Sequence, residues 1–234
     1  MEFTLDNSLL PDLVLGGNPA PSGPPAEIFR AYDIRGHIDS LTPDLVSQIG
    51  RALGTILKEK YQHQVVVGYD ARLTSPSYAK RIREALVQCG LTVIDIGLVP
   101  TPLMHFAARQ HDGNGIMVTA SHNPGTDNGI KWVMETHPPL PEEIQGVRDR
   151  LIKAEFAEGS GQERQENYLD SYIEFLMGDI MLSEGQSVTF DGLNGAMGPV
   201  ALTAFNAFGM QVSSLNANPD GNFPLGNPDP AEPG

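Results

Sequence analysis

The chain has 234 residues, 40% of them hydrophobic, a composition typical of a folded globular protein with one large domain or two small ones. Its net charge is −14, from 29 acidic residues against 15 Lys and Arg, and the absence of a dense basic cluster excludes nucleic acid and an anionic membrane surface as partners. With no apolar run near the roughly 20 residues that span a bilayer, no secretory signal and Cys89 as the only cysteine, we expect a cytoplasmic protein without disulfides.

In chain order, residues 1–25 end in a Pro- and Gly-rich run that predicts a flexible tail. From residue 26, short apolar runs alternate with helical patterns. We expect strands at 64–69, 91–96, 115–119 and 130–134. Three helices are predicted to begin at a hydroxyl residue followed by Pro, in which the hydroxyl caps the helix; these pairs are Thr42-Pro43, Ser75-Pro76 and Thr101-Pro102. The alternation predicts an α/β fold over residues 26–156, ending in a helix at 141–156.

Beyond residue 156 the composition changes. Residues 157–164, rich in Gly, Ser and charged side chains, predict a linker. A helix is expected at 165–178, followed by one strand–helix–strand unit from Ser187 to Leu215. Two strands cannot bury both faces of a sheet, so residues 165–234 predict an incomplete second α/β domain.

The sequence Thr-Ala-Ser-His-Asn-Pro at 119–124 follows a buried strand, which places it at the carboxyl end of the sheet, where ligands of α/β proteins usually bind. Ser121 is a small nucleophile, His122 can exchange protons, and Asn123 helps to stiffen the turn. Lys131 brings a cation back on the next strand. Backbone N–H groups and an ammonium suit a phosphate dianion, although these residue types alone also fit an ordinary solvated turn.

A second group of chemically active side chains lies at 29–36, Phe-Arg-Ala-Tyr-Asp-Ile-Arg-Gly. In a chain with few cations, Arg30, Tyr32 and Arg35 suit a phosphate-binding edge, because guanidinium groups bind phosphate oxygens in pairs. A strand with exposed charges is the alternative. Arg72 adds a third loop cation.

Three segments in this order, 29–36, 119–124 and Asn-Gly-Ile-Lys at 128–131, resemble the α-D-phosphohexomutase superfamily. The Tyr-Asp-Ile-Arg-Gly form resembles its phosphomannomutase/phosphoglucomutase group. The resemblance continues through Asp191–Ala196 and Pro219–Pro224. It implies a mixed β-sheet sandwiched between helices as domain I, followed by an incomplete second α/β domain.

The resemblance also implies a mechanism. Ser121 would carry a phosphoryl group and exchange it with hexose phosphates, interconverting hexose 1-phosphate and hexose 6-phosphate through a hexose 1,6-bisphosphate. Mg²⁺ would bind the phosphorylated Ser121. Lys131 matches a residue of proton transfer or phosphate contact, and His122 a possible acid/base. Binding of substrate and phosphate would fall to four residues, Tyr32, Arg35, Arg30 and Asn123.

The sequence departs from the family in two ways. Tyr69 stands where an Arg is common. Family enzymes are also longer, with four domains and an Asp-Gly-Asp-Gly-Asp-Arg loop that supplies the Mg²⁺ ligands, and these 234 residues do not contain it. We therefore expect the N-terminal portion of a mutase, with little or no turnover alone. A non-catalytic sugar-phosphate-binding or regulatory module is the alternative, and a serine hydrolase is disfavoured because no Gly-x-Ser-x-Gly elbow is present.

Overall fold

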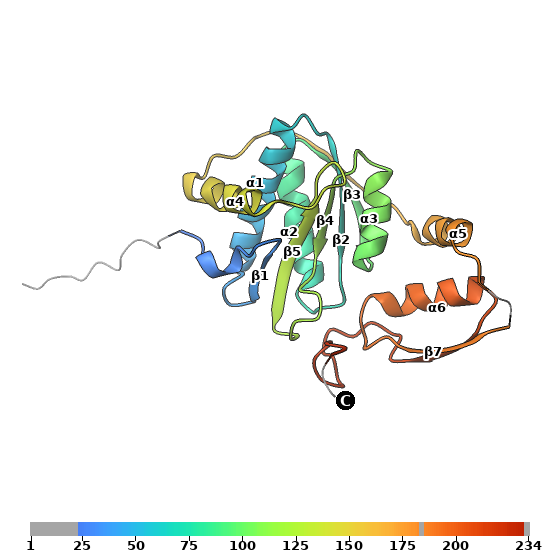
Figure 1. Cartoon of the computed structure of the whole chain (residues 1–234). Helices are drawn as coiled ribbons and strands as arrows, with labels where there is room; N and C mark the ends of the chain where they lie inside the picture. Colours follow the sequence, from blue (N-terminus) through green and yellow to red (C-terminus); the bar gives the residue numbers. More distant parts are fainter. Residues whose placement is uncertain (1–22, 183–184, 232–234) are drawn as a thin grey trace, which may run out of the picture.

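The computed structural model describes residues 23–182 and 185–231, which form two units (Figure 1). The first unit is a six-stranded sheet with helices on both faces. After a 3₁₀ turn at Ala26–Ile28 its elements are β1 Ile34–His37, α1 Pro43–Glu59, β2 Gln64–Tyr69, α2 Ser75–Gln88, β3 Thr92–Leu98, α3 Thr101–Arg109, β4 Gly115–Val118, β5 Asp127–Val133, α4 Pro141–Lys153 and β6 Gln162–Gln165. The α/β fold with a mixed sheet is thereby confirmed.

The strand order of this sheet is β1-β5-β4-β2-β3-β6. The pairs β4–β2, β2–β3 and β3–β6 are parallel, whereas β5 runs antiparallel to both β4 and β1. The loop between β4 and β5 therefore reverses the chain at the carboxyl end of β4. The first strand, β1, closes the sheet on the far side of β5.

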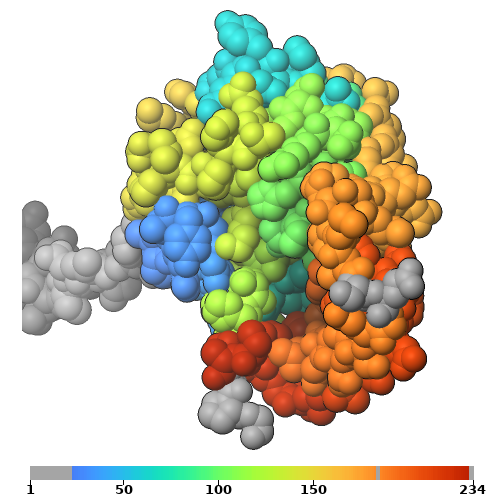
Figure 2. All heavy atoms as spheres, turned by 45° about the vertical axis from the view of Figure 1, so that its right-hand side comes forward, coloured from blue at the N-terminus to red at the C-terminus, as the bar shows by residue number. Residues whose placement is uncertain are grey.

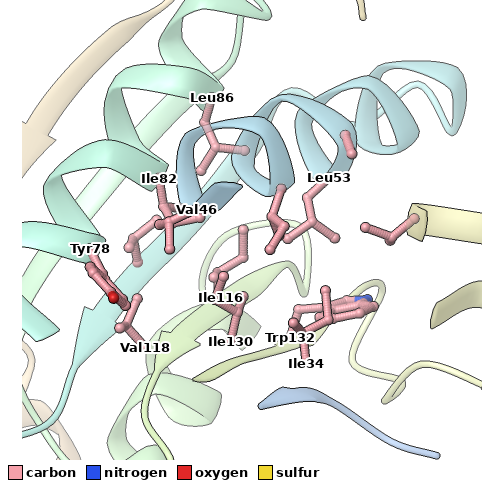
Figure 3. Packing of buried hydrophobic residues seen from close by; sticks show 14 of the residues in the cluster. Ile34, Val46, Leu53, Tyr78, Ile82, Leu86, Ile116, Val118, Ile130 and Trp132 are labelled. Carbon is pink, nitrogen blue, oxygen red and sulfur yellow. The ribbon is translucent and has the colours of Figure 1, made fainter. Parts of the chain in front are cut away.

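The side chains of the central strands contribute alternately to two hydrophobic cores, since successive residues of a strand face opposite sides of the sheet. Val65 and Val67 of β2 join the core beneath α1, α2 and α4, whereas Val66 joins the core beneath α3. Figure 1 shows α3 on the opposite face from these three helices. In the larger core, Figure 3 shows Val46, Ile82 and Leu86 packed toward Ile116 and Trp132.

All three helices begin within one residue of the predicted start at a hydroxyl–Pro pair, but the predicted cap by the hydroxyl is confirmed at only one of them. Thr42 caps α1, with its hydroxyl accepting a hydrogen bond from the Leu45 N–H at 3.3 Å. By contrast, α2 and α3 begin at Ser75 and Thr101 themselves, with no side-chain cap. Ser75 uses its hydroxyl to donate to Asp70 Oδ1 at 2.6 Å. The Ser75 hydroxyl is therefore bonded to the Asp70 carboxylate and does not cap the N-terminus of α2.

The segment for which the sequence predicted a linker, 157–164, contains part of β6, a strand of the main sheet. Gly161 donates to the Val87 carbonyl at 2.9 Å, and a Cβ at Gly161 would lie 2.0 Å from the Leu91 oxygen. The glycine therefore allows close approach of two backbones rather than flexibility. All four side chains of β6 are exposed, so no hydrophobic alternation marked it as a strand.

The second unit contains α5 Leu169–Asp179, β7 Ser187–Asp191, α6 Met197–Ala207 and β8 Gln211–Leu215. Its sheet is a parallel pair, as the single strand–helix–strand unit predicted. No helix in the described part of the chain is long and apolar enough to cross a membrane. Most of the predicted tail, residues 1–22, lies outside the described residues.

Candidate active site

Residues 119–127, which we call the serine loop, run from the end of β4 to the first residue of β5. Thr119 anchors the start of the loop: its backbone N–H donates to the Gly129 carbonyl, and its hydroxyl accepts from the Ser121 N–H, both at 2.9 Å. Ser121 has a φ of 59°, in the left-handed region that non-glycine residues seldom adopt. Its side chain is exposed. The loop thus presents a hydroxyl on a constrained backbone, the arrangement in which strain commonly accompanies function.

Arg72, directly after β2, holds the serine loop from inside the protein. It is only 1% exposed, and its side chain donates five hydrogen bonds. Nε donates to Asp70 at 3.1 Å, and the two Nη atoms donate to four carbonyls of the loop, those of Ser121, Asn123, Pro124 and Asp127, at 2.5–2.9 Å. A guanidinium has five N–H donors, so all are used. Burial lowers the pKa of Arg72, but a guanidinium remains protonated in proteins.

Asp33 forms the centre of a buried ionic cluster beside the serine loop. Its Oδ2 accepts from Arg35 Nε at 3.1 Å, from Arg35 Nη2, and from Lys131 Nζ at 2.6 Å. Arg35 in turn donates from Nη1 to Asn123 Oδ1 at 2.9 Å and to the Ala120 carbonyl at 3.4 Å. Because two cations surround one carboxylate, the cluster retains net positive charge at the edge of the loop.

The remaining predicted residues lie around this cluster at different depths. The Tyr32 ring lies 5.3 Å from Lys131 Nζ and 6.0 Å from Arg35 Cζ, with 62% of the residue exposed. His122 is exposed, with Nδ1 3.4 Å from Ser121 Oγ. Arg30 donates from Nε to the Arg35 carbonyl at 3.2 Å, so it supports the strand that carries the cluster.

Six of the seven predicted residues therefore lie in or beside the serine loop and the ionic cluster. The seventh, Arg30, contacts the backbone of Arg35 through its side chain. The alternative of a strand with exposed charges does not hold for β1, since Arg35 is buried. Two residues were missed: Asp33, inside the same sequence motif, and Arg72, noted only as a loop cation. The signal that could have identified both was acidic residues, Asp33 and Asp70, two positions from arginines in a chain with few cations.

The second unit faces Ser121 across a pocket of about 350 Å³. Asp70, Thr119 and Ser121 line one side, and the loop after β7, with Gly192 and Leu193, lines the other. Within the described residues, no group of three His, Cys, Asp or Glu is arranged to hold a metal ion. The pocket thus offers a hydroxyl, but no preformed metal cage among the residues that the structure describes.

Comparison with known proteins identifies the family of this chain. Residues 26–158 match the family described as phosphoglucomutase/phosphomannomutase, alpha/beta/alpha domain I. The chain is 40% identical over 211 residues to phosphomannomutase/phosphoglucomutase of Pseudomonas aeruginosa, covering 89% of this chain and 46% of the relative. It is 34% identical over 211 residues to phosphoglucomutase of Neisseria gonorrhoeae, covering 88% and 46%.

Among solved structures, a phosphoglucomutase/phosphomannomutase family protein of Burkholderia thailandensis superposes with a TM-score of 0.84 at 38% identity. The match covers 88% of this chain and 47% of that one. The chain thus spans about half the length of the curated relatives it matches. The family match across the sheet and serine loop, together with these relatives, establishes that the chain belongs to the phosphoglucomutase/phosphomannomutase family.

Proposed function

We propose that Ser121 carries a phosphoryl group and exchanges it with hexose phosphates, in a protein that interconverts hexose 1-phosphate and hexose 6-phosphate through a hexose 1,6-bisphosphate. The observation that carries this proposal is the position of the Ser121 hydroxyl. It is exposed on a loop fixed by Arg72, it lines a pocket, and the loop that carries it is bonded to the Asp33–Arg35–Lys131 cluster. Membership of the family supports the same assignment.

The chemistry needs positioning and charge compensation more than covalent chemistry by the protein. When the phosphoryl group leaves Ser121, its bond to Oγ breaks and a bond to a sugar hydroxyl forms. The sugar hydroxyl releases one proton to solvent and Oγ takes up one, so protons balance over the transfer. The 3.4 Å separation between His122 Nδ1 and Oγ supports His122 as the donor of the proton that Oγ takes up. Arg35 and Lys131 supply the positive charge that stabilises the transferring oxygens.

Mg²⁺ would neutralise charge on a phosphorylated Ser121. A phosphoserine would offer oxygen ligands to this hard cation, but the neighbouring carboxylates are engaged: Asp70 binds Arg72 and Ser75, and Asp33 binds Arg35 and Lys131. The described residues therefore do not complete a magnesium site around Ser121.

The test is incubation of the protein with glucose 1,6-bisphosphate and Mg²⁺, followed by intact-mass measurement and phosphopeptide mapping. We expect one phosphoryl group, on Ser121, in the wild type and in Ser160→Ala, an exposed serine away from the serine loop. Ser121→Ala should take up none. Phosphate on another residue of a protein that still turns over would refute the assignment.

Measured affinities for a sugar phosphate distinguish a protein that transfers the phosphoryl group from one that only binds the ligand. Arg35→Ala should weaken affinity for a sugar phosphate in both cases, because the cluster loses one of its two cations. If Ser121 is never labelled and Ser121→Ala leaves affinity unchanged, the chain is a sugar-phosphate-binding module and the proposal of phosphoryl transfer fails.

A further inference from the structure

The segment after β8 packs against the serine loop instead of trailing away from the second unit. Residues 219–223, Pro-Asp-Gly-Asn-Phe, which we call the phenylalanine turn, lie against the loops that follow β2 and β4. Gly221 makes the closest approach: a Cβ there would lie 2.4 Å from the Ala71 oxygen and 2.6 Å from the Leu73 nitrogen. Figure 2 shows the red C-terminal segment directly against yellow-green atoms of the first unit.

The Phe223 ring covers the guanidinium of Arg72, with the Arg72 Cζ 5.7 Å from the ring centroid. It also packs on Gly125 of the serine loop. All five donors of Arg72 lie in the guanidinium plane and are already bonded, four of the five bonds going to serine-loop carbonyls. A further partner can approach only the face of the plane, and an aromatic ring is the group that attracts a cation there.

The phenylalanine turn is fixed at its other side to the second unit. The Asp220 N–H donates to the Asn194 carbonyl, and Asn194 Nδ2 donates to the Asn218 carbonyl, both at 2.9 Å. Asn194 follows Gly192 and Leu193, which face Ser121 across the pocket. One bonded assembly therefore reaches the surroundings of Ser121 twice. Leu193 lies across the pocket, and Phe223, which lines the same pocket, contacts the Arg72 side chain that holds the serine loop.

We infer that Phe223 is a positioning residue for Ser121. Its ring holds the Arg72 guanidinium in place, and the guanidinium fixes the serine-loop backbone so that Ser121 faces the pocket. The second unit thereby sets the geometry of a nucleophile that it does not contain. This inference rests on the proposed function, because its kinetic consequence is the rate of phosphoryl transfer at Ser121.

Phe223→Leu tests this, since Leu keeps apolar bulk but lacks an aromatic face. In the protein at its native length, we expect phosphorylation of Ser121 and kcat to fall about 2-fold to 30-fold, the range of one cation–π contact. KM for the sugar phosphate should change little, because the phosphate-binding cations Arg35 and Lys131 are untouched and Leu keeps apolar bulk where Phe223 lines the pocket. Phe223→Tyr should restore the rate. Phe175→Leu, a partly exposed phenylalanine on α5, is the matched control.

Hydrogen exchange of the amides of 119–127 gives a second readout that needs no turnover. Exchange should quicken in Phe223→Leu, return to the wild-type rate in Phe223→Tyr, and remain unchanged in Phe175→Leu. Gly221→Ala perturbs the same contact independently, by forcing the phenylalanine turn away from Ala71, and should quicken exchange in the same segment.

The outcomes separate the two proposals. Wild-type exchange over 119–127 and wild-type kcat in Phe223→Leu would overturn the inference, as would equal losses in Phe223→Leu and Phe223→Tyr. If wild-type Ser121 takes no phosphate, the proposed function fails, and the exchange measurements alone decide whether Phe223 positions the loop.

Discussion

Asp33→Asn removes the charge of the buried cluster while nearly preserving the shape of the side chain. The Asp33 side chain is 1% exposed and that of Arg35 is 6% exposed, so the substitution leaves a buried cation without its partner. Such a loss destabilises proteins by about 3–5 kcal/mol. Lys131 is 25% exposed and Arg35 keeps Asn123, which favours the lower end, about 3 kcal/mol.

At this chain length, each kcal/mol shifts the melting temperature by about 2–4 °C, so we expect Asp33→Asn to melt about 6–12 °C lower. Phosphate affinity should move in the opposite direction, because the cluster changes from one net positive charge to two and attracts anions more strongly. The variant should therefore gain more stability from added phosphate than the wild type does.

The assay is thermal unfolding at low ionic strength, with and without inorganic phosphate, because salt screens the effect. Asp149→Asn, an exposed carboxylate on α4, is the control for loss of one negative charge elsewhere. A melting temperature within about 1 °C of the wild type would refute the energetic argument. Weaker stabilisation by phosphate than in the wild type would refute the electrostatic one.

Three further predictions concern single contacts. Arg72→Lys offers at most three donors in place of five, so at least two partly buried acceptors lose this partner. At about 1–3 kcal/mol for each acceptor left unpaired, denaturant unfolding should show a loss of about 2–6 kcal/mol; a loss below about 1 kcal/mol would contradict the role of Arg72. Thr119→Val removes the acceptor of the Ser121 N–H and should lower the free energy of unfolding by about 1 kcal/mol. It should also slow phosphorylation of Ser121, measured by mass spectrometry. An unchanged rate would show that this hydrogen bond does not fix the conformation of the serine loop. The Leu140 N–H holds the pKa of Glu143 below its ordinary value, so the stability it contributes is present above the unfolded pKa of about 4.3 and is lost as pH falls through the folded pKa; Glu143→Gln should flatten the acid side of the unfolding profile, and an unchanged slope would contradict this.

Much of the first unit could be predicted from sequence, because its strands are continuous apolar runs and its helices have one apolar face. Strand β6 could not, since its Gln-Glu-Arg-Gln sequence buries no side chain and its position depends on pairing with β3. The cluster residues were predicted from motifs, but Asp33 and Arg72 were missed. Their importance comes from partners distant in sequence: Asp33 binds Lys131, and Arg72 binds carbonyls of the serine loop.

The same holds for the phenylalanine turn. Gly and Pro at 219–224 predict irregular chain, and the segment is indeed irregular. Nothing local in that pattern indicates that it packs on Arg72. Side-chain contacts between irregular segments have no periodic signature, so they become visible only in three dimensions.

The antiparallel pairing of β1 with β5 has a consequence for how the site forms. Asp33 and Lys131 meet across 98 positions of sequence, and Arg35 meets Asn123 across 88. Contacts of such separation form only after most of the intervening chain is ordered, because closing long loops is entropically costly. Strand β1 therefore cannot take its place in the sheet until its partner strand β5 is available. During synthesis, a nascent chain has no complete cationic cluster beside Ser121 until β5 has emerged and β1 has paired with it, so Ser121 gains these neighbours only after Lys131 has been synthesised.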